Sequence, residues 1–311
     1  MIGAALDEAM TAGPREQTLR AHDVWVATDS AFQRRCRLRQ GLWRESQGFP
    51  AGVHRGAPLG SRLLMPRAKE RLENYLSDSI REVVRREVVD GPRAGRLFGE
   101  PRIYDNLLSS QPLCFNLFAE LQQDLALATR FFARRCARVA AVTGVRFEHS
   151  PGRGERRYTD DNSAFDVYVA YDTAAGGRGF LGIEVKYHEA LGDPAADHRP
   201  RYDELAHSAG WWKAESLPLL RLKPMQQMWR DHLLAASLID QGDADEGAFV
   251  FLAPRDNDAC AAATLAYARH LARPETFLAW DLESVVADLV AVGMPAAPAV
   301  AARYLFPPGE R

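Results

Sequence analysis

Two short apolar runs near the middle of the chain constrain its fold more than any other feature. Residues 164–171 and 180–187 have the length of strands and are rich in β-branched and aromatic residues, and a glycine-rich segment typical of a hairpin-like link separates them. The first run carries Asp166, and the second carries Glu184 and Lys186. Side chains two residues apart on a strand project from the same face. We therefore expect Glu184 and Lys186 to lie together, with Asp166 contributed by the neighbouring strand.

The remaining pattern predicts helices on both faces of a sheet. Helices are expected at residues 21–44, 66–89, 109–142, 202–212, 259–271 and 283–292, with another beginning at Pro224. Further strands are expected at 145–148 and 249–253, and an irregular loop at 48–62. This order indicates an α/β fold with a mixed central sheet flanked by helices. We expect a helical, arginine-rich N-terminal region at 1–99 and the α/β domain at 100–311.

The composition is that of an ordinary globular protein. The 311 residues are 47% hydrophobic and 26% charged, which suffices for a sizeable core. The four cysteines are far apart and form no CxxC pair, so reduced, buried thiols are expected rather than disulfides or a zinc site. The N-terminus lacks the apolar core of a signal peptide, and the longest apolar run, 289–302, is too short to span a bilayer. We therefore expect a cytoplasmic protein with no membrane role.

The formal net charge of −2 hides an asymmetry along the chain. Residues 1–160 carry 26 Lys and Arg against 19 Asp and Glu, whereas the remainder carries 13 against 22. A basic half could contact phosphates while an acidic half holds metal ions. An arginine-biased, solvated surface would explain the same numbers.

The lysine at position 186 sharpens the chemical interpretation of the two strands. The chain contains four lysines against 35 arginines, so a lysine at this point suggests that an ammonium group is needed. Magnesium prefers carboxylate and carbonyl oxygens, so Asp166, Glu184 and the backbone carbonyl of Val185 form a candidate metal shell. Lys186 would then orient or deprotonate a water molecule, which predicts phosphodiester hydrolysis. The competing interpretation is an exposed Glu184–Lys186 pair on an edge strand.

The motifs around these residues resemble the PD-(D/E)xK nuclease superfamily, and more closely a group of predicted bacterial restriction endonucleases within it. The resemblance covers roughly residues 100–255, with a weaker echo at 68–75. Phe165 occupies the position of the superfamily's proline. The stretches that carry the resemblance are Asn106 to Phe118, Phe147 to Arg153, Ala164 to Tyr168, Ile183 to Lys186, and Gln226 to His232.

The resemblance implies a restriction-endonuclease-like three-layer core and a magnesium-dependent cut that leaves a 5′-phosphate, with manganese able to substitute. It also implies a helix-supplied glutamate beside Asp166, Glu184 and Lys186. Glu120 fits that helical position, whereas Glu148, on the first strand, lies in a stronger local motif; the sequence does not choose between them.

The helix after the third strand is expected to present polar side chains to the substrate. Gln227, Arg230 and His232 are the candidates, and Arg230 could bind a phosphate with two hydrogen bonds. The leading hypothesis is a restriction-type or defence endonuclease that cleaves DNA, and a homodimer is the assembly considered for it. The alternatives are a DNA-repair nuclease, a non-cleaving nucleic-acid-binding module with the same fold, and a small-molecule hydrolase.

Overall fold

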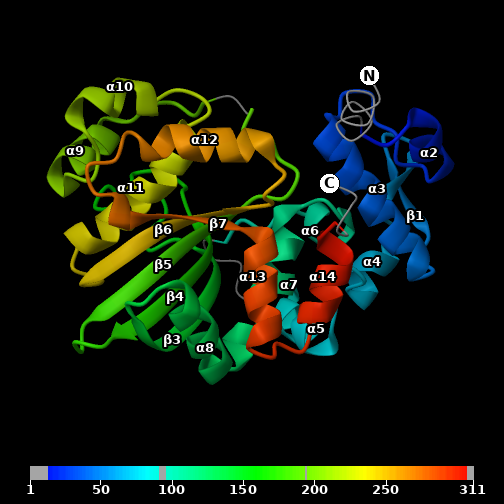
Figure 1. Ribbon diagram of the computed structural model, residues 1–311, viewed down its shortest axis with the longest axis horizontal. Coiled ribbons are helices and arrows are strands. Elements are labelled where there is room, and N and C mark those ends of the chain that lie inside the picture. Colours follow the sequence, from blue (N-terminus) through cyan, green and yellow to red (C-terminus); the bar gives the residue numbers. More distant parts are fainter. Residues whose placement is uncertain (1–12, 91–95, 193–194, 307–311) are drawn as a thin grey trace, which may run out of the picture.

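A five-stranded mixed sheet forms the centre of the protein (Figure 1). The computed structural model describes residues 13–90, 96–192 and 195–306. The strand order is β3-β4-β5-β6-β7, in which β3, β4 and β5 are antiparallel and β6 and β7 continue parallel to β5. The predicted mixed sheet is therefore confirmed. The strands are β3 (Val139–His149), β4 (Phe165–Thr173), β5 (Arg178–Val185), β6 (Glu246–Ala253) and β7 (Phe277–Asp281).

The central pair β4 and β5 forms the predicted antiparallel hairpin. Its register places Val167 opposite Ile183, so Asp166 and Glu184 lie one residue beyond the last paired positions. Alternation along the strands sends the odd-numbered residues Val167 and Ile183 into one hydrophobic core. The even-numbered positions face the opposite side of the sheet, where Tyr168 and Phe180 enter a second core.

Helices cover both faces of the sheet, as the sequence pattern predicts (Figure 1). Two aromatic-rich cores, one on each side, bury the helices against the strands. The first face carries α7 (Ser110–Gln123), α8 (Leu125–Arg135), α13 (Leu282–Ala291) and α14 (Ala297–Tyr304). The second carries α9 (Pro200–Ala209), α10 (Leu217–Leu220), α11 (Gln226–Asp240) and α12 (Asp258–Ala268).

The helix predicted at 109–142 is wrong in its extent, because the structure divides it into α7 and α8 and then begins a strand. Asp124 adopts an extended conformation between the two helices, and its side chain accepts a hydrogen bond from the backbone N–H of Leu127. This N-cap starts a second helix at a new angle. Strand β3 starts at Val139, earlier than predicted, because apolar residues here pair with β4. The sequence pattern did not predict β7 or α14.

The N-terminal region departs most from prediction. The helix predicted at 21–44 is shorter: α2 (Glu16–Ala21) precedes it, and α3 (Ala31–Ser46) begins only where Ser30 and Gln33 form a capping box. The expected loop at 48–62 is largely a hairpin of β1 (Ala51–His54) and β2 (Ala57–Leu63). This region is therefore not purely helical.

The long helix predicted at 66–89 is also interrupted. Helix α4 (Arg67–Arg71) ends at Leu72, which adopts a left-handed conformation with φ 51°. The chain resumes helical structure at α5 (Asp78–Val84), which continues as a π-helical turn over Arg85–Val89. The apolar residues keep a helical spacing on both sides of Leu72, so their periodicity alone does not reveal the break. The remaining short elements are α6 (Arg102–Asp105) and two 3-10 turns, Ala214–Ser216 and Pro274–Thr276.

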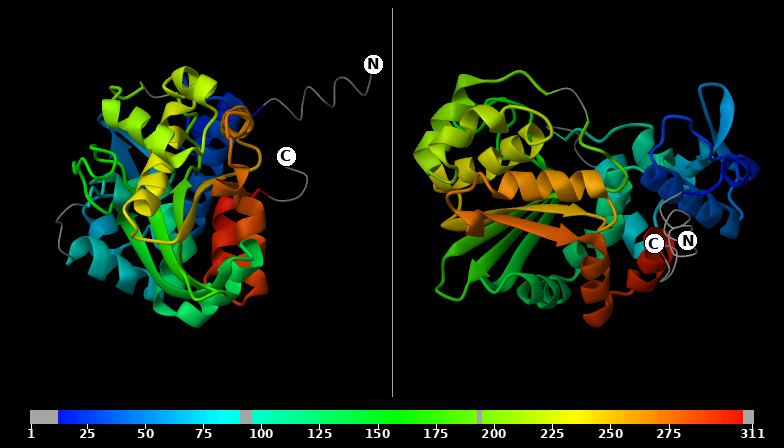
Figure 2. Two further views of the ribbon diagram at one scale, coloured as in Figure 1. Left: turned by 90° about the vertical axis from the view of Figure 1, so that its left-hand side faces the viewer. Right: turned by 45° about the horizontal axis from the view of Figure 1, so that its top comes forward.

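The N-terminal elements pack on the same core as the rest of the chain. Cys36, Tyr75 and Ile80 belong to the core that contains Phe115 and Val167, so this core crosses the boundary predicted at residue 99. Figure 2 shows these elements beside the C-terminal helix α14. None of the helices in the described ranges combines the length and the apolar character needed to cross a membrane. All four cysteines are free and buried.

Candidate active site

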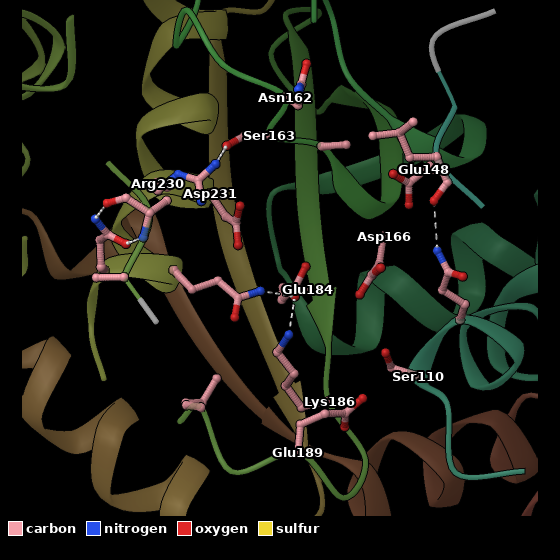
Figure 3. A pocket seen from close by; sticks show the side chains of 18 of the residues that line it. Ser110, Glu148, Asn162, Ser163, Asp166, Glu184, Lys186, Glu189, Arg230 and Asp231 are labelled. Carbon is pink, nitrogen blue, oxygen red and sulfur yellow. Dashed lines mark hydrogen bonds and ion pairs between the residues drawn. The ribbon is translucent and has the colours of Figure 1, made fainter. Parts of the chain in front are cut away.

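A cavity of about 510 Å³ opens where β4 begins and β5 ends, on the face of the sheet covered by α11. Both acidic and basic side chains line this cavity, and they come from strands, helices and loops (Figure 3). Such a mixture of buried charges around a cavity is typical of a catalytic site. The charged side chains that line it are Arg102, Glu148, Arg153, Asp166, Glu184, Lys186, Glu189, Lys223, Arg230 and Asp231.

Asp166 faces the cavity from the beginning of β4. Its Oδ2 accepts a hydrogen bond of 2.8 Å from the backbone N–H of Val185, the last residue of β5. Burial and the neighbouring charge of Glu184 raise the pKa of Asp166 well above its usual range. The strand pairing thus places the two carboxyl groups beside each other, and the repulsion between them favours a bound cation.

Glu184 and Lys186 project from the same face, as the spacing of two residues predicts. Glu184 Oε1 accepts hydrogen bonds from Lys186 Nζ at 2.7 Å and from Gln227 Nε2 at 2.8 Å. The side chains of Glu184 and Lys186 are 9% and 11% exposed, so they are not an exposed pair on an edge strand. Gln227 comes from the first turn of α11, which confirms that this helix presents a polar side chain to the cavity.

The charge state of Lys186 follows from its surroundings. Burial by itself lowers the pKa of this ammonium, but the carboxyl groups of Glu184, Glu189 and Asp166 outweigh burial and raise the pKa above its usual value. Lys186 therefore provides a positive charge beside the carboxylates in this arrangement. Its expected role in orienting or deprotonating a water molecule stays a prediction.

Of the two candidate glutamates, the structure brings Glu148 to the cavity and leaves Glu120 outside it. Glu148 is the penultimate residue of β3 and has φ 49°, a left-handed conformation that turns the chain at the cavity wall. Its Oε1 accepts a hydrogen bond of 2.7 Å from Arg153, and burial raises its pKa despite this partner. Glu120 lies on α7 as predicted, but its carboxylate accepts hydrogen bonds from Ser77, Ser79 and the backbone of Ala296. These contacts give Glu120 a structural role, since its buried carboxylate holds three neighbouring segments together.

Arg230 lines the cavity from the second turn of α11 and is held there by Asp161. Its Nε and Nη2 donate to Asp161 Oδ2 at 3.0 and 2.7 Å. Asp161 also accepts hydrogen bonds from the hydroxyl groups of Thr159, Ser163 and Tyr202. Burial opposes the ionisation of Asp161, yet these hydroxyl groups and Arg230 lower its pKa. Sequence reasoning missed Asp161 because it lies in a polar loop with no periodic signal.

His232 does not reach the cavity, which corrects its assignment to substrate binding. The ring is fully buried among aromatic side chains on the far side of α11. Trp212 donates to the hydroxyl of Tyr267, so that hydroxyl donates in turn to Nδ1 of His232. The Thr276 hydroxyl donates to a backbone carbonyl and accepts from Nε2. The imidazole is therefore neutral, and burial lowers its pKa to about 3.

The oxygens around the cavity fit a hard divalent cation. Oδ2 of Asp166 accepts the hydrogen bond from the N–H of Val185, and Oε1 of Glu184 accepts both hydrogen bonds made to that carboxylate. The second oxygen of each carboxylate therefore remains for a cation. The N–H of Lys186 pairs with β6, so the amide and carbonyl of Val185 point the other way, toward Asp166. Within the described ranges, no three His, Cys, Asp or Glu side chains could hold one ion together. Two carboxylates, a carbonyl and water suit magnesium.

Comparison with protein families gives a match that spans most of the chain. The family model of the PD-(D/E)XK nuclease superfamily matches residues 27–306. The match includes α3 and the N-terminal hairpin, which the motif resemblance did not cover. No curated protein and no solved structure matches the chain significantly.

Proposed function

Because the chain belongs to the PD-(D/E)XK nuclease superfamily, we propose that it is a metal-dependent nuclease that hydrolyses phosphodiester bonds in DNA. The observation that carries this proposal is the convergence of Asp166, Glu184 and Lys186 on one cavity, with a free oxygen on each carboxylate. Members of the superfamily generally use divalent metal ions.

Asp166, Glu184 and the carbonyl of Val185 would hold the metal, for which we propose Mg²⁺ with Mn²⁺ as a substitute. A bound divalent ion supplies Lewis-acid stabilisation of charge on the phosphate and lowers the pKa of a bound water molecule. The protein's own contribution is to keep two carboxylates beside each other in a site of low exposure. Lys186 offsets part of their charge through its contact with Glu184.

The cationic side chains of the cavity would position the substrate. Lys186 supplies a buried positive charge beside the place where negative charge develops on the phosphate. Arg230 is oriented by Asp161 through Nε and Nη2, which leaves Nη1 for a phosphate oxygen. Glu148 lines the same cavity as Asp166, where it would order a water molecule or the metal shell. Gln227 would keep Glu184 in place through the hydrogen bond to Oε1.

A DNA substrate is supported by the excess of arginine in residues 1–160, which suits a polyanion. We propose a restriction-type or defence role in the cytoplasm, in keeping with the resemblance to predicted restriction endonucleases. Cutting both strands with a single site per chain favours a homodimer.

The test is a digestion panel of duplex, single-stranded and methylated DNA and of RNA, with Mg²⁺, Mn²⁺ or a chelator. We expect metal-dependent nicking by the wild type, which Asp166→Ala and Lys186→Ala each abolish. Melting curves of each variant ensure that folded proteins are compared. Full activity in either variant would refute the site. Salt-dependent DNA binding with no cleavage of any substrate would favour a non-cleaving binding module instead.

A further inference from the structure

Asn257 is a buried side chain outside the cavity that none of the roles above uses. It follows β6 as the N-cap of α12 and is 2% exposed. Its Oδ1 accepts a hydrogen bond of 3.2 Å from the backbone N–H of Cys260. Its Nδ2 donates to the carbonyls of Tyr187 at 3.3 Å and of Glu189 at 2.9 Å. The amide therefore uses both of its N–H donors outside its own helix, which the capping of α12 does not require.

Residues 187–189, which Asn257 holds, directly follow the lysine of the proposed site. Strand β5 ends at Val185, and the N–H of Lys186 pairs with β6 through the carbonyl of Leu252. Beyond that point, no backbone-to-backbone hydrogen bond holds residues 187–189 in the described part of the chain. The position of this segment therefore depends on hydrogen bonds from side chains.

The backbone of Glu189 depends on Asn257 more than the backbone of the preceding residue does. Helix α3 also holds His188, whose carbonyl accepts a hydrogen bond of 3.2 Å from Gln33 Nε2. The carbonyl of Glu189 accepts the hydrogen bond from Asn257 and a weak one, at 3.5 Å, from Sγ of Cys260. Removing the amide of Asn257 should therefore release Glu189 first.

Glu189 contributes a negative charge that acts on Lys186. It lines the cavity, and Figure 3 shows it next to Lys186. Burial opposes the ionisation of Glu189, yet His188, Lys186 and the N–H of Tyr187 outweigh burial and lower the pKa of Glu189 to about 2. For Lys186, burial lowers the pKa, and Glu184 and Glu189 are the two carboxylates that raise it most. A shift of Glu189 would therefore remove one of the two main attractions that act on the Lys186 ammonium.

We propose that Asn257 is a positioning residue of the active site, which fixes the backbone of Glu189 so that Glu189 and Glu184 together hold Lys186 in place. The catalytic consequence rests on the proposed nuclease function. A displacement of about 1 Å at a reacting site can cost roughly 100-fold in rate, even when the changed residue lies far from the chemistry. Because Asn257 lies outside the cavity, its loss should lower kcat and leave the KM for DNA unchanged.

The test uses Asn257→Ser in the full-length protein, because serine caps a helix about as well as asparagine but lacks the amide that donates to the two carbonyls. We expect kcat for plasmid nicking with Mg²⁺ to fall roughly 10- to 100-fold at an unchanged KM. Asp124→Ser is the matched control and should keep the wild-type kcat, since Asp124 caps α8 through the N–H of Leu127 and lies outside the cavity. Glu189→Gln should lower kcat as Asn257→Ser does. The two changes combined should lower kcat no further than the larger of the single losses.

Hydrogen–deuterium exchange of the metal-free proteins gives a second readout, which needs no activity. Residues 186–190 should exchange faster in Asn257→Ser than in the wild type, because local opening of this segment becomes easier. Asp124→Ser should leave the exchange of these residues unchanged. A wild-type kcat in Asn257→Ser, an effect on KM alone, or losses that multiply in the combined variant would overturn the positioning role.

The two proposals fail separately in this design. If the wild type nicks DNA and Asn257→Ser nicks it equally well, the positioning role is wrong and the nuclease function stands. If the wild type cleaves no nucleic acid but exchange rises in Asn257→Ser alone, the hold of Asn257 on Glu189 stands and the nuclease function is wrong.

Discussion

Exchanging glutamate for glutamine should lower the stability of the protein at position 120 and its activity at position 148. The reason is that Glu120 is buried in structural hydrogen bonds, whereas Glu148 faces the cavity. Glu120 is 6% exposed and accepts three hydrogen bonds, from Ser77 at 2.9 Å, Ser79 at 2.6 Å and the backbone of Ala296 at 2.9 Å. Glu148 lines the cavity and is paired with Arg153.

The loss of stability expected for Glu120→Gln can be worked out from the hydrogen bonds of Glu120. A hydrogen bond to a charged group contributes about 1.5–3 kcal/mol, against about 1 kcal/mol for a neutral pair. Glutamine can keep its oxygen toward Ala296 and donate to the two serine hydroxyls, so the contacts survive without the charge. We expect a loss of about 2–3 kcal/mol in the free energy of unfolding, or roughly 3–5 °C in Tm for a chain of this length. The kcat of the folded protein should not change.

Glu148→Gln should behave in the opposite way. The glutamine still accepts a hydrogen bond from Arg153, so the loss of stability should be small. The change removes a charge beside Asp166, and groups that orient a metal site typically contribute about 10- to 100-fold to activity. The assays are thermal melting and initial rates of plasmid nicking with Mg²⁺ for both variants. A fully active Glu148→Gln protein, or a folded but inactive Glu120→Gln protein, would refute the assignment.

Three further outcomes follow from the contacts. The pKa of His232 is about 6.5 in the unfolded chain and about 3 in the folded one, so its stabilising effect is complete above pH 6.5 and lost as the pH falls. Between pH 7 and pH 5 this residue should cost about 2 kcal/mol, and His232→Gln should flatten that slope in urea melts. Asp161→Asn should release Arg230 and raise the KM for DNA about 10-fold with little change in kcat, in steady-state assays; an unchanged KM would contradict the positioning role. Lys186→Arg should retain the fold but lower kcat at least about 10-fold, because a guanidinium does not reproduce a compact ammonium, and near-normal cleavage would argue otherwise.

The central strands and their chemistry were predictable because the signals are local. The run from Phe165 and the run from Phe180 each have strand length and bury their apolar residues, and the glycine-rich link between them favours a hairpin. A spacing of two residues was enough to place Glu184 and Lys186 on one face. These inferences needed no knowledge of distant contacts.

The predicted helices and loops differ from the structure where the same spacing of apolar residues is compatible with more than one backbone conformation. Apolar residues at helical spacing continue across Leu72, yet that residue turns into the left-handed region and ends α4. Asp124 similarly separates α7 from α8 by capping the second helix. The sequence over the hairpin of β1 and β2 indicates a loop, because its glycines and prolines outweigh the weak strand pattern.

The amino-acid sequence by itself determined the mixed α/β class, the central hairpin, and the acids and lysine that the hairpin presents, since strand periodicity relates neighbouring residues directly. Only the tertiary structure decided which glutamate reaches the cavity, that His232 is buried in a core, and that Asp161 orients Arg230. It also buried Oδ2 of Asp231 without a hydrogen-bond partner among the residues that the structure describes. Each of these depends on how helices distant in the sequence pack against the sheet, and periodicity says which face is buried but not which residues meet across it.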